Sequence, residues 1–185
     1  MSGTALQFSN SALVATDCSF ETAVSAALPI VTGSGFAGDT PVLFNDNHFA
    51  ATDRSAPLFA FDGQGQLTAW LELRGNRFSG GIQEAVALSD CNSFLWENMF
   101  HNFRHPKSPA NRSATVSIKG TADDIWPSAV LARNRLGQTD VALRLSGRVS
   151  LAAHSNRFSD CTVYLSLIHI SEPTRPERIG DGGLG

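Results

Sequence analysis

The stretch LELRGNRF, Leu71–Phe78, carries the pattern that decides the fold. Two aliphatic residues one position apart are followed, after two further residues, by Asn-x-Phe. Related stretches recur along the chain: LVATDCSF (13–20), VLFNDNHF (42–49), SFLWENMF (93–100), AVLARNRL (129–136) and LAAHSNRF (151–158). The key positions of the six copies, Cys18, Asn47, Asn76, Asn98, Asn134 and Asn156, are 29, 29, 22, 36 and 22 residues apart. The chain is therefore built from one repeated unit.

The spacing indicates a coil of about 22 residues that loops lengthen in some repeats. Coils of this size with alternating apolar residues are typical of a parallel β-solenoid, in which each coil stacks ~4.8 Å from the next. Like residues then form columns. We predict that the phenylalanines form an inward column and that the residue between Asn and Phe points outward. The asparagines are predicted to take left-handed backbone at a bend and to hydrogen-bond to one another between coils.

Over residues 10–164, the Asn-x-Phe copies resemble the coils of right-handed parallel β-helix proteins, the pectate-lyase-like superfamily. The resemblance implies an all-β domain, and the repeat gives it about six coils; the adapter-like tail described below implies that the domain is truncated at its C-terminal end. A left-handed β-helix is disfavoured because its strict hexapeptide period is absent. A β-sandwich also alternates, but it would not place Asn-x-Phe at multiples of one coil.

Two functions are compatible with this resemblance. One is a non-catalytic structural module of a phage tail or microbial surface, which presents loops to glycans or to partner subunits. The alternative is a fragment of a polysaccharide lyase or glycoside hydrolase. An extracellular, surface or virion-associated location is implied by the resemblance alone, since residues 1–10 show no signal peptide.

The amino-acid composition narrows the class of protein. The chain has 185 residues, a formal net charge of −3, 42% hydrophobic residues and 12 phenylalanines. The absence of a basic excess argues against a nucleic-acid binder, and the apolar content argues against a disordered chain. No apolar run reaches the roughly 18–20 residues of a membrane span. Three cysteines do not make a disulfide scaffold, and Cys91 and Cys161, both in Ser-Asp-Cys triplets, are expected to be buried fillers.

The last 21 residues, 165–185, change character and lack the repeat. Their first part, LSLIHISEPTR (165–175), is similar to the translated sequence of a sequencing-library adapter. We therefore expect an incomplete β-helix domain over residues 1–164 and a non-native tail without ordered structure over residues 165–185.

Basic residues are the candidate ligand-binding groups. Three of them, Arg77, Arg135 and Arg157, occupy the outward column, where guanidinium groups can grip carboxylates or sulfates of a polysaccharide. Three more lie in the long spacing between Phe100 and Ala129: Arg104, Lys107 and Arg112. We expect Phe103–Ser117 to be a replaceable loop. The alternatives are a solvated loop and local neutralisation of the arginine column by Asp17, Asp46, Glu97 and Asp160.

Catalytic chemistry has little support in the sequence. The weak candidates are Asp123 and Asp124, the adjacent acidic pair, but neighbouring strand residues point to opposite faces and the other motifs of the related hydrolases are absent. His101 and His105 are four residues apart without a third ligand, so no metal and no cofactor is expected. The sequence favours the non-catalytic module, with a polysaccharide or neighbouring subunits as partners.

Overall fold

The computed structural model describes residues 4–22, 28–35, 42–51, 56–64, 70–80, 84–104, 114–121 and 126–168. All regular structure in these ranges is β-strand. The strands are β1 (Leu6–Ser9), β2 (Leu13–Thr16), β3 (Ser19–Thr22), β4 (Val31–Ser34), β5 (Val42–Asn45), β6 (His48–Ala51), β7 (Phe59–Asp62), β8 (Trp70–Arg74), β9 (Arg77–Ser79), β10 (Val86–Ser89), β11 (Asn92–Trp96), β12 (Met99–Phe103), β13 (Ala114–Gly120), β14 (Ser128–Ala132), β15 (Arg135–Gly147), β16 (Ser150–His154) and β17 (Arg157–Ile168).

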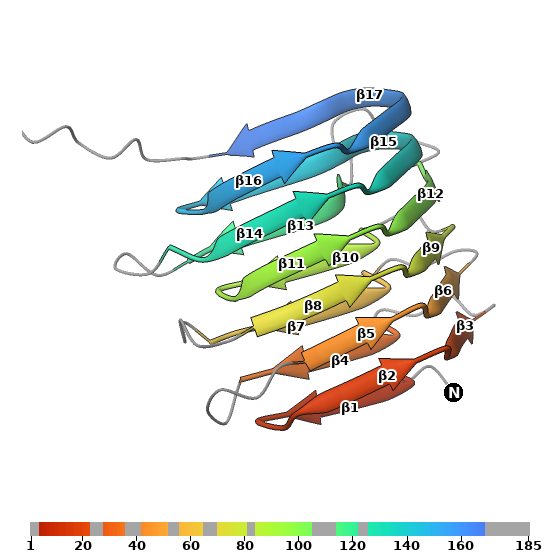
Figure 1. The fold of residues 1–185 in the computed structure, drawn as a ribbon, viewed down its shortest axis with the longest axis vertical. Helices are drawn as coiled ribbons and strands as arrows, with labels where there is room; N and C mark the ends of the chain where they lie inside the picture. Colours follow the sequence, from red (N-terminus) through yellow and green to blue (C-terminus); the bar gives the residue numbers. More distant parts are fainter. Residues whose placement is uncertain are drawn as a thin grey trace, which may run out of the picture.

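The strands wind into stacked coils with three walls (Figure 1). The first wall contains β1, β4, β7, β10, β13 and the second halves of β15 and β17. The second wall contains β2, β5, β8, β11, β14 and β16, and the third contains β3, β6, β9, β12 and the first halves of β15 and β17. Neighbouring strands pair in parallel throughout the described ranges. The predicted all-β parallel solenoid of about six coils is confirmed.

Left-handed residues form the corner between the second and third walls. One stands there in each coil, and the six are Asp17, Asp46, Gly75, Glu97, Arg133 and Ser155. Each directly precedes the repeated asparagine or Cys18, so the prediction that the asparagine itself is left-handed is wrong. The reason is geometric: the residue with positive φ turns the chain, and the next side chain can then point inward beneath the turn. At Gly75 an added Cβ would meet the side-chain oxygen Oδ1 of Asp46, whereas the other five coils accommodate a side chain at this corner.

The asparagine side chains form a ladder beneath this corner. Asn76 Oδ1 accepts hydrogen bonds from the backbone N–H of Asn47, at 2.9 Å, and from its side-chain amide, at 3.0 Å. The amide of Asn76 in turn donates to Asn98 Oδ1, at 3.0 Å, and to the carbonyl of Phe44, at 2.7 Å. The same pattern continues from Asn98 to Asn134 and on to Asn156. The predicted bonding between coils is confirmed, and it satisfies polar groups that are almost fully buried.

Stacked phenylalanines fill the interior behind the third wall. The ring centroids of Phe20 and Phe49 are 5.0 Å apart, those of Phe49 and Phe78 4.6 Å, and those of Phe78 and Phe100 4.9 Å. The rings lie within 11° of parallel, because each strand presents the same position to the strand of the next coil. The predicted inward column is confirmed, although Leu136 separates Phe100 from Phe158.

The prediction of a replaceable loop over Phe103–Ser117 is wrong at both ends. Phe103 is buried in β12, and β13 begins at Ala114 as a strand of the first wall. Its side chains Val116 and Ile118 are also buried. The long spacing contains a first-wall strand because every coil needs one. Residues 105–113 and 122–125, which include Lys107, Arg112, His105, Asp123 and Asp124, lie outside the described residues.

The last strand crosses the expected domain boundary at residue 164. Leu165–Ile168 continue β17 and pair with residues 143–146 of β15. The side chains of Leu165 and Leu167 are 45% and 58% exposed there. Residues 169–185 lie outside the described part of the chain. The adapter-derived origin of the tail stays a prediction.

Candidate functional site

The third wall presents two outward rows that run along the axis of the helix. The arginine row, one residue after each ladder position, consists of Ser19, His48, Arg77, Met99, Arg135 and Arg157. The second row, two residues after the arginine row in each coil, consists of Glu21, Ala50, Ser79, His101, Gly137 and Ser159. Between them lie the inward phenylalanines, so the predicted alternation is confirmed on this wall.

The three arginines of the row are exposed. Arg135 and Arg157 are direct register partners on adjacent coils, whereas Met99 separates Arg77 from Arg135. Within the described residues, no carboxylate forms an ion pair with any of these three guanidinium groups. Glu97 pairs with Arg133 at 3.3 Å instead. The local neutralisation considered from the sequence is therefore not found in the described part of the chain.

Two hollows flank the upper end of the arginine row. One hollow, of about 550 Å³, is lined by Gly137 together with Met99, Phe158, Arg135 and Arg157. Gly137 has no side chain to fill this space. The other, of about 480 Å³, lies at the corner beside Arg133 and Ser155. Arg135 and Arg157 line both hollows.

The remaining basic candidates do not join this row. Arg104 follows β12, and its Nη2 donates a hydrogen bond to the backbone carbonyl of Asp160 at 3.2 Å. This contact ties neighbouring parts of the third wall together, which is a structural role. Lys107 and Arg112 lie outside the described residues.

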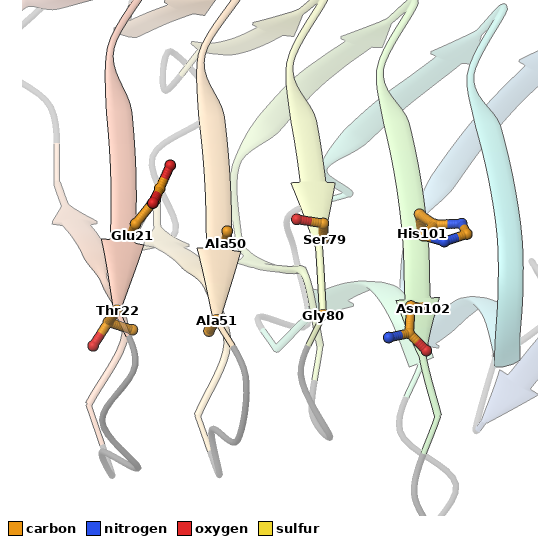
Figure 2. Close-up of a pocket in the computed structure, with 8 residues that line it drawn as sticks. All are labelled: Glu21, Thr22, Ala50, Ala51, Ser79, Gly80, His101 and Asn102. Atoms are coloured by element: carbon orange, nitrogen blue, oxygen red, sulfur yellow. The ribbon is translucent and has the colours of Figure 1, made fainter.

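A third hollow, of about 460 Å³, lies lower on the same wall (Figure 2). Its lining comes from four successive strands, β3, β6, β9 and β12, and consists of Glu21, Thr22, Ala50, Ala51, Ser79, Gly80, His101 and Asn102. Beside it, Ser79 Oγ lies 3.4 Å from His48 Nε2, and His48 Nδ1 lies 3.4 Å from Glu21 Oε1. Sequence reasoning assigned no role to Glu21 or Ser79, although the aligned repeat already places both in one outward row.

The first wall carries a smaller hollow, of about 230 Å³, with Asp62 and Lys119 as its charged groups. Asp62 is the single carboxylate among the residues that line this hollow, whereas a glycoside hydrolase uses a pair of carboxylates. Nearby, burial raises the pKa of Glu84, while Arg144 and a hydrogen bond from Ser117 oppose this shift. Within the described ranges, no three His, Cys, Asp or Glu side chains are grouped to hold a metal ion.

Cys91 and Cys161 do not supply a reactive thiolate. Cys91 is buried, as predicted, and burial together with the charges of Asp62 and Asp90 raises the pKa of its thiol far above the ordinary value. Burial also raises the pKa of Cys161, which is only partly buried. Both thiols therefore stay protonated near neutral pH, and a protonated thiol is a poor nucleophile.

Comparison with protein-family models, with curated proteins and with solved structures finds no match to this chain. The part of the chain that the structure describes contains no helix able to cross a membrane. The candidate site is therefore inferred from the geometry of the three walls.

Proposed function

We propose that the chain is a structural β-helix module that binds an acidic glycan along the arginine row of its third wall. The observation that carries the proposal is that Arg77, Arg135 and Arg157 are exposed and have no carboxylate partner among the described residues. Guanidinium groups stay charged at all physiological pH values and bind carboxylates or sulfates through forked hydrogen bonds. They are ligand-binding groups and not acids or bases.

The fold presents these groups at a regular spacing. Arg135 and Arg157 are register partners, so their Cα atoms are one strand spacing apart, ~4.8 Å, and Arg77 lies two coils before Arg135. The ladder and the phenylalanine stack fix the backbone of the wall, so binding has to order the arginine side chains but not the strands that carry them. A linear polyanion laid along the helix axis would meet successive guanidinium groups. The alternative is a fragment of a lyase or hydrolase. The hollow of the first wall has one lining carboxylate, Asp62, and therefore gives this alternative no support.

Titration of the full chain with polygalacturonate tests this function, with neutral dextran as the comparison polymer. We expect the chain to bind polygalacturonate and not dextran. Binding should weaken as the salt concentration is raised, because exposed charges are screened over about 8 Å at physiological ionic strength. The double variant Arg135→Gln/Arg157→Gln should weaken binding at least about tenfold, which corresponds to ~1.4 kcal/mol.

The matched control is Arg74→Gln/Lys119→Gln, which removes the same charge from the second and first walls. Both side chains are exposed and lie outside the arginine row. Binding to this control should stay within about twofold of the unmodified chain, because net charge contributes only a general attraction. Equal loss in the two double variants would contradict a site on the third wall.

A further inference from the structure

Three side chains on consecutive coils of the third wall are arranged as nucleophile, base and orienting acid. Ser79 Oγ lies 3.4 Å from His48 Nε2, and Glu21 Oε1 lies 3.4 Å from His48 Nδ1. The three residues belong to β9, β6 and β3. Active serines on unrelated folds are identified by this geometry and by the order of contacts, not by their place in the sequence.

The register explains why these side chains meet. Glu21, Ala50 and Ser79 are direct partners across β3, β6 and β9, so they form part of one outward row. His48 lies two residues before Ala50 on the middle strand, and both Glu21 and Ser79 are its diagonal neighbours. Diagonal neighbours on a sheet are within reach of long side chains. The small methyl group of Ala50 leaves the imidazole space to contact both.

The contacts are compatible with one arrangement of the protons. Glu21 Oε1 lies 3.4 Å from His48 Nδ1, so a proton on Nδ1 faces the carboxylate, and Nε2 is then the acceptor for the Ser79 hydroxyl. Ser19 Oγ donates to the same carboxylate oxygen at 2.8 Å and so helps to fix its orientation. This tautomer is the one that a general base for serine requires. The distances of 3.4 Å are in the looser range found before a substrate binds.

A recess for a substrate lies beside the cluster and is lined by both Ser79 and Glu21. The hollow of about 460 Å³ has a floor of small residues, Ala50, Ala51 and Gly80, and Asn102 stands at its far side (Figure 2). Figure 2 shows the amide nitrogen of Asn102 on the side of Gly80. Within the described residues this amide has no hydrogen-bond partner, so it is free to donate to an oxyanion. The shallow apolar floor suits a small acyl group.

We propose that the Glu21–His48–Ser79 cluster hydrolyses small acyl esters of alcohols. Ser79 Oγ attacks the ester carbonyl carbon while its proton passes to His48 Nε2. The carbon–oxygen bond to the alcohol then breaks, and His48 returns the proton to the departing alkoxide, leaving an acyl-serine. Water attacks this acyl group and gives one proton to His48; the bond from the acyl carbon to Ser79 Oγ then breaks, His48 returns the proton to Ser79 Oγ, and the carboxylic acid leaves.

This activity is distinct from glycan binding, because the reaction uses none of Arg77, Arg135 and Arg157, although His48 lies beside Arg77 in the same outward row. In this mechanism Ser79 and His48 are the catalytic residues, since they contact the reacting atoms. Glu21 is a positioning residue, because it acts through the imidazole.

Hydrolysis of 4-nitrophenyl acetate by the full chain, together with labelling by a fluorophosphonate, tests the proposal. We expect saturable hydrolysis and a single phosphonylated residue, Ser79, identified by peptide mass spectrometry. Ser79→Ala should abolish labelling and lower kcat about 10²- to 10⁴-fold. Ser34→Ala, an outward serine on β4 of the first wall, is the matched control and should change neither result. Circular dichroism of each variant verifies the fold.

Two further variants separate catalysis from structure. Glu21→Gln should lower kcat with KM unchanged, because the imidazole loses its fixed tautomer while the hollow is intact. In Ser79→Cys, alkylation of the new thiol by iodoacetamide should be faster with His48 present than in Ser79→Cys/His48→Gln. The proposal is overturned if the unmodified chain neither hydrolyses the ester nor is labelled, or if Ser79→Ala keeps either property.

Discussion

Two identical tripeptides, Asn76-Arg77-Phe78 and Asn156-Arg157-Phe158, occupy the same position in two different coils. Phe78 is 1% exposed and Phe158 is 40% exposed. The sequence and the local strand geometry are the same, so the difference arises from the neighbours. Phe78 stacks between Phe49 and Phe100, whereas in the described residues Phe158 packs against an edge of Tyr164 and has no further coil above it.

The asparagines of the two tripeptides differ in the same way. Asn76 accepts from Asn47 on one side and donates to Asn98 on the other. Asn156 accepts from Asn134 and donates to the carbonyl of Leu131, and no ladder contact follows it within the described ranges. A coil is therefore stabilised through its interfaces with the coils on each side, as expected for a solenoid. The three predictions below test this by substituting matched positions in both tripeptides.

The largest difference is expected at the phenylalanines. Phe78→Ala should lower the free energy of unfolding by about 3–5 kcal/mol, because it removes a buried ring that has stacked neighbours on both sides and leaves a cavity. Phe158→Ala should cost about 1–2 kcal/mol, since much of that ring already contacts water. Urea unfolding followed by circular dichroism measures both values. Equal costs would show that Phe158 is covered in solution.

A smaller difference is expected at the asparagines. Asn76→Ala leaves the buried backbone N–H of Asn47 without its acceptor, and an unpaired buried donor costs about 1–3 kcal/mol. Asn156→Ala removes the acceptor of the Asn134 N–H, but this position is only partly buried, so water can replace the bond at a lower cost. The same urea series measures the pair. A larger loss for Asn156→Ala would contradict the account of the ladder as a set of two-sided contacts.

Much of this fold could be predicted from the sequence because the repeat reports on columns. Asn-x-Phe recurs at one coil position, so the inward ring of Phe78 and the outward side chain of Arg77 both followed from alternation. The left-handed residue before each asparagine could not be read in the same way. Its identity changes from Asp46 to Gly75 to Arg133, since the corner selects a backbone angle and not a side chain.

The parts that were wrong or missed depend on register between coils with loops of unequal length. Alignment on the asparagines alone left the first-wall strand at Ala114 without a matching signal, so it was assigned to a loop. The contact of His48 with Glu21 and Ser79 spans diagonal positions on three coils. It becomes visible only when β3, β6 and β9 are placed side by side.

The smallest effect is expected at the arginines, and it is the sharpest test of the alternation. Arg77 and Arg157 are both exposed on the third wall, with no ion pair to a described carboxylate. Arg77→Ala and Arg157→Ala should each change the free energy of unfolding by no more than about 0.5 kcal/mol, as surface substitutions usually do. Unlike the phenylalanines and asparagines, the two arginines should give equal values, because an outward side chain gains nothing from the coil stacked on its strand. Denaturant unfolding of the two variants beside Phe78→Ala measures this. A cost for Arg77→Ala close to that of Phe78→Ala would mean that the inward and outward faces of β9 are exchanged, and the arginine row would then not be a surface.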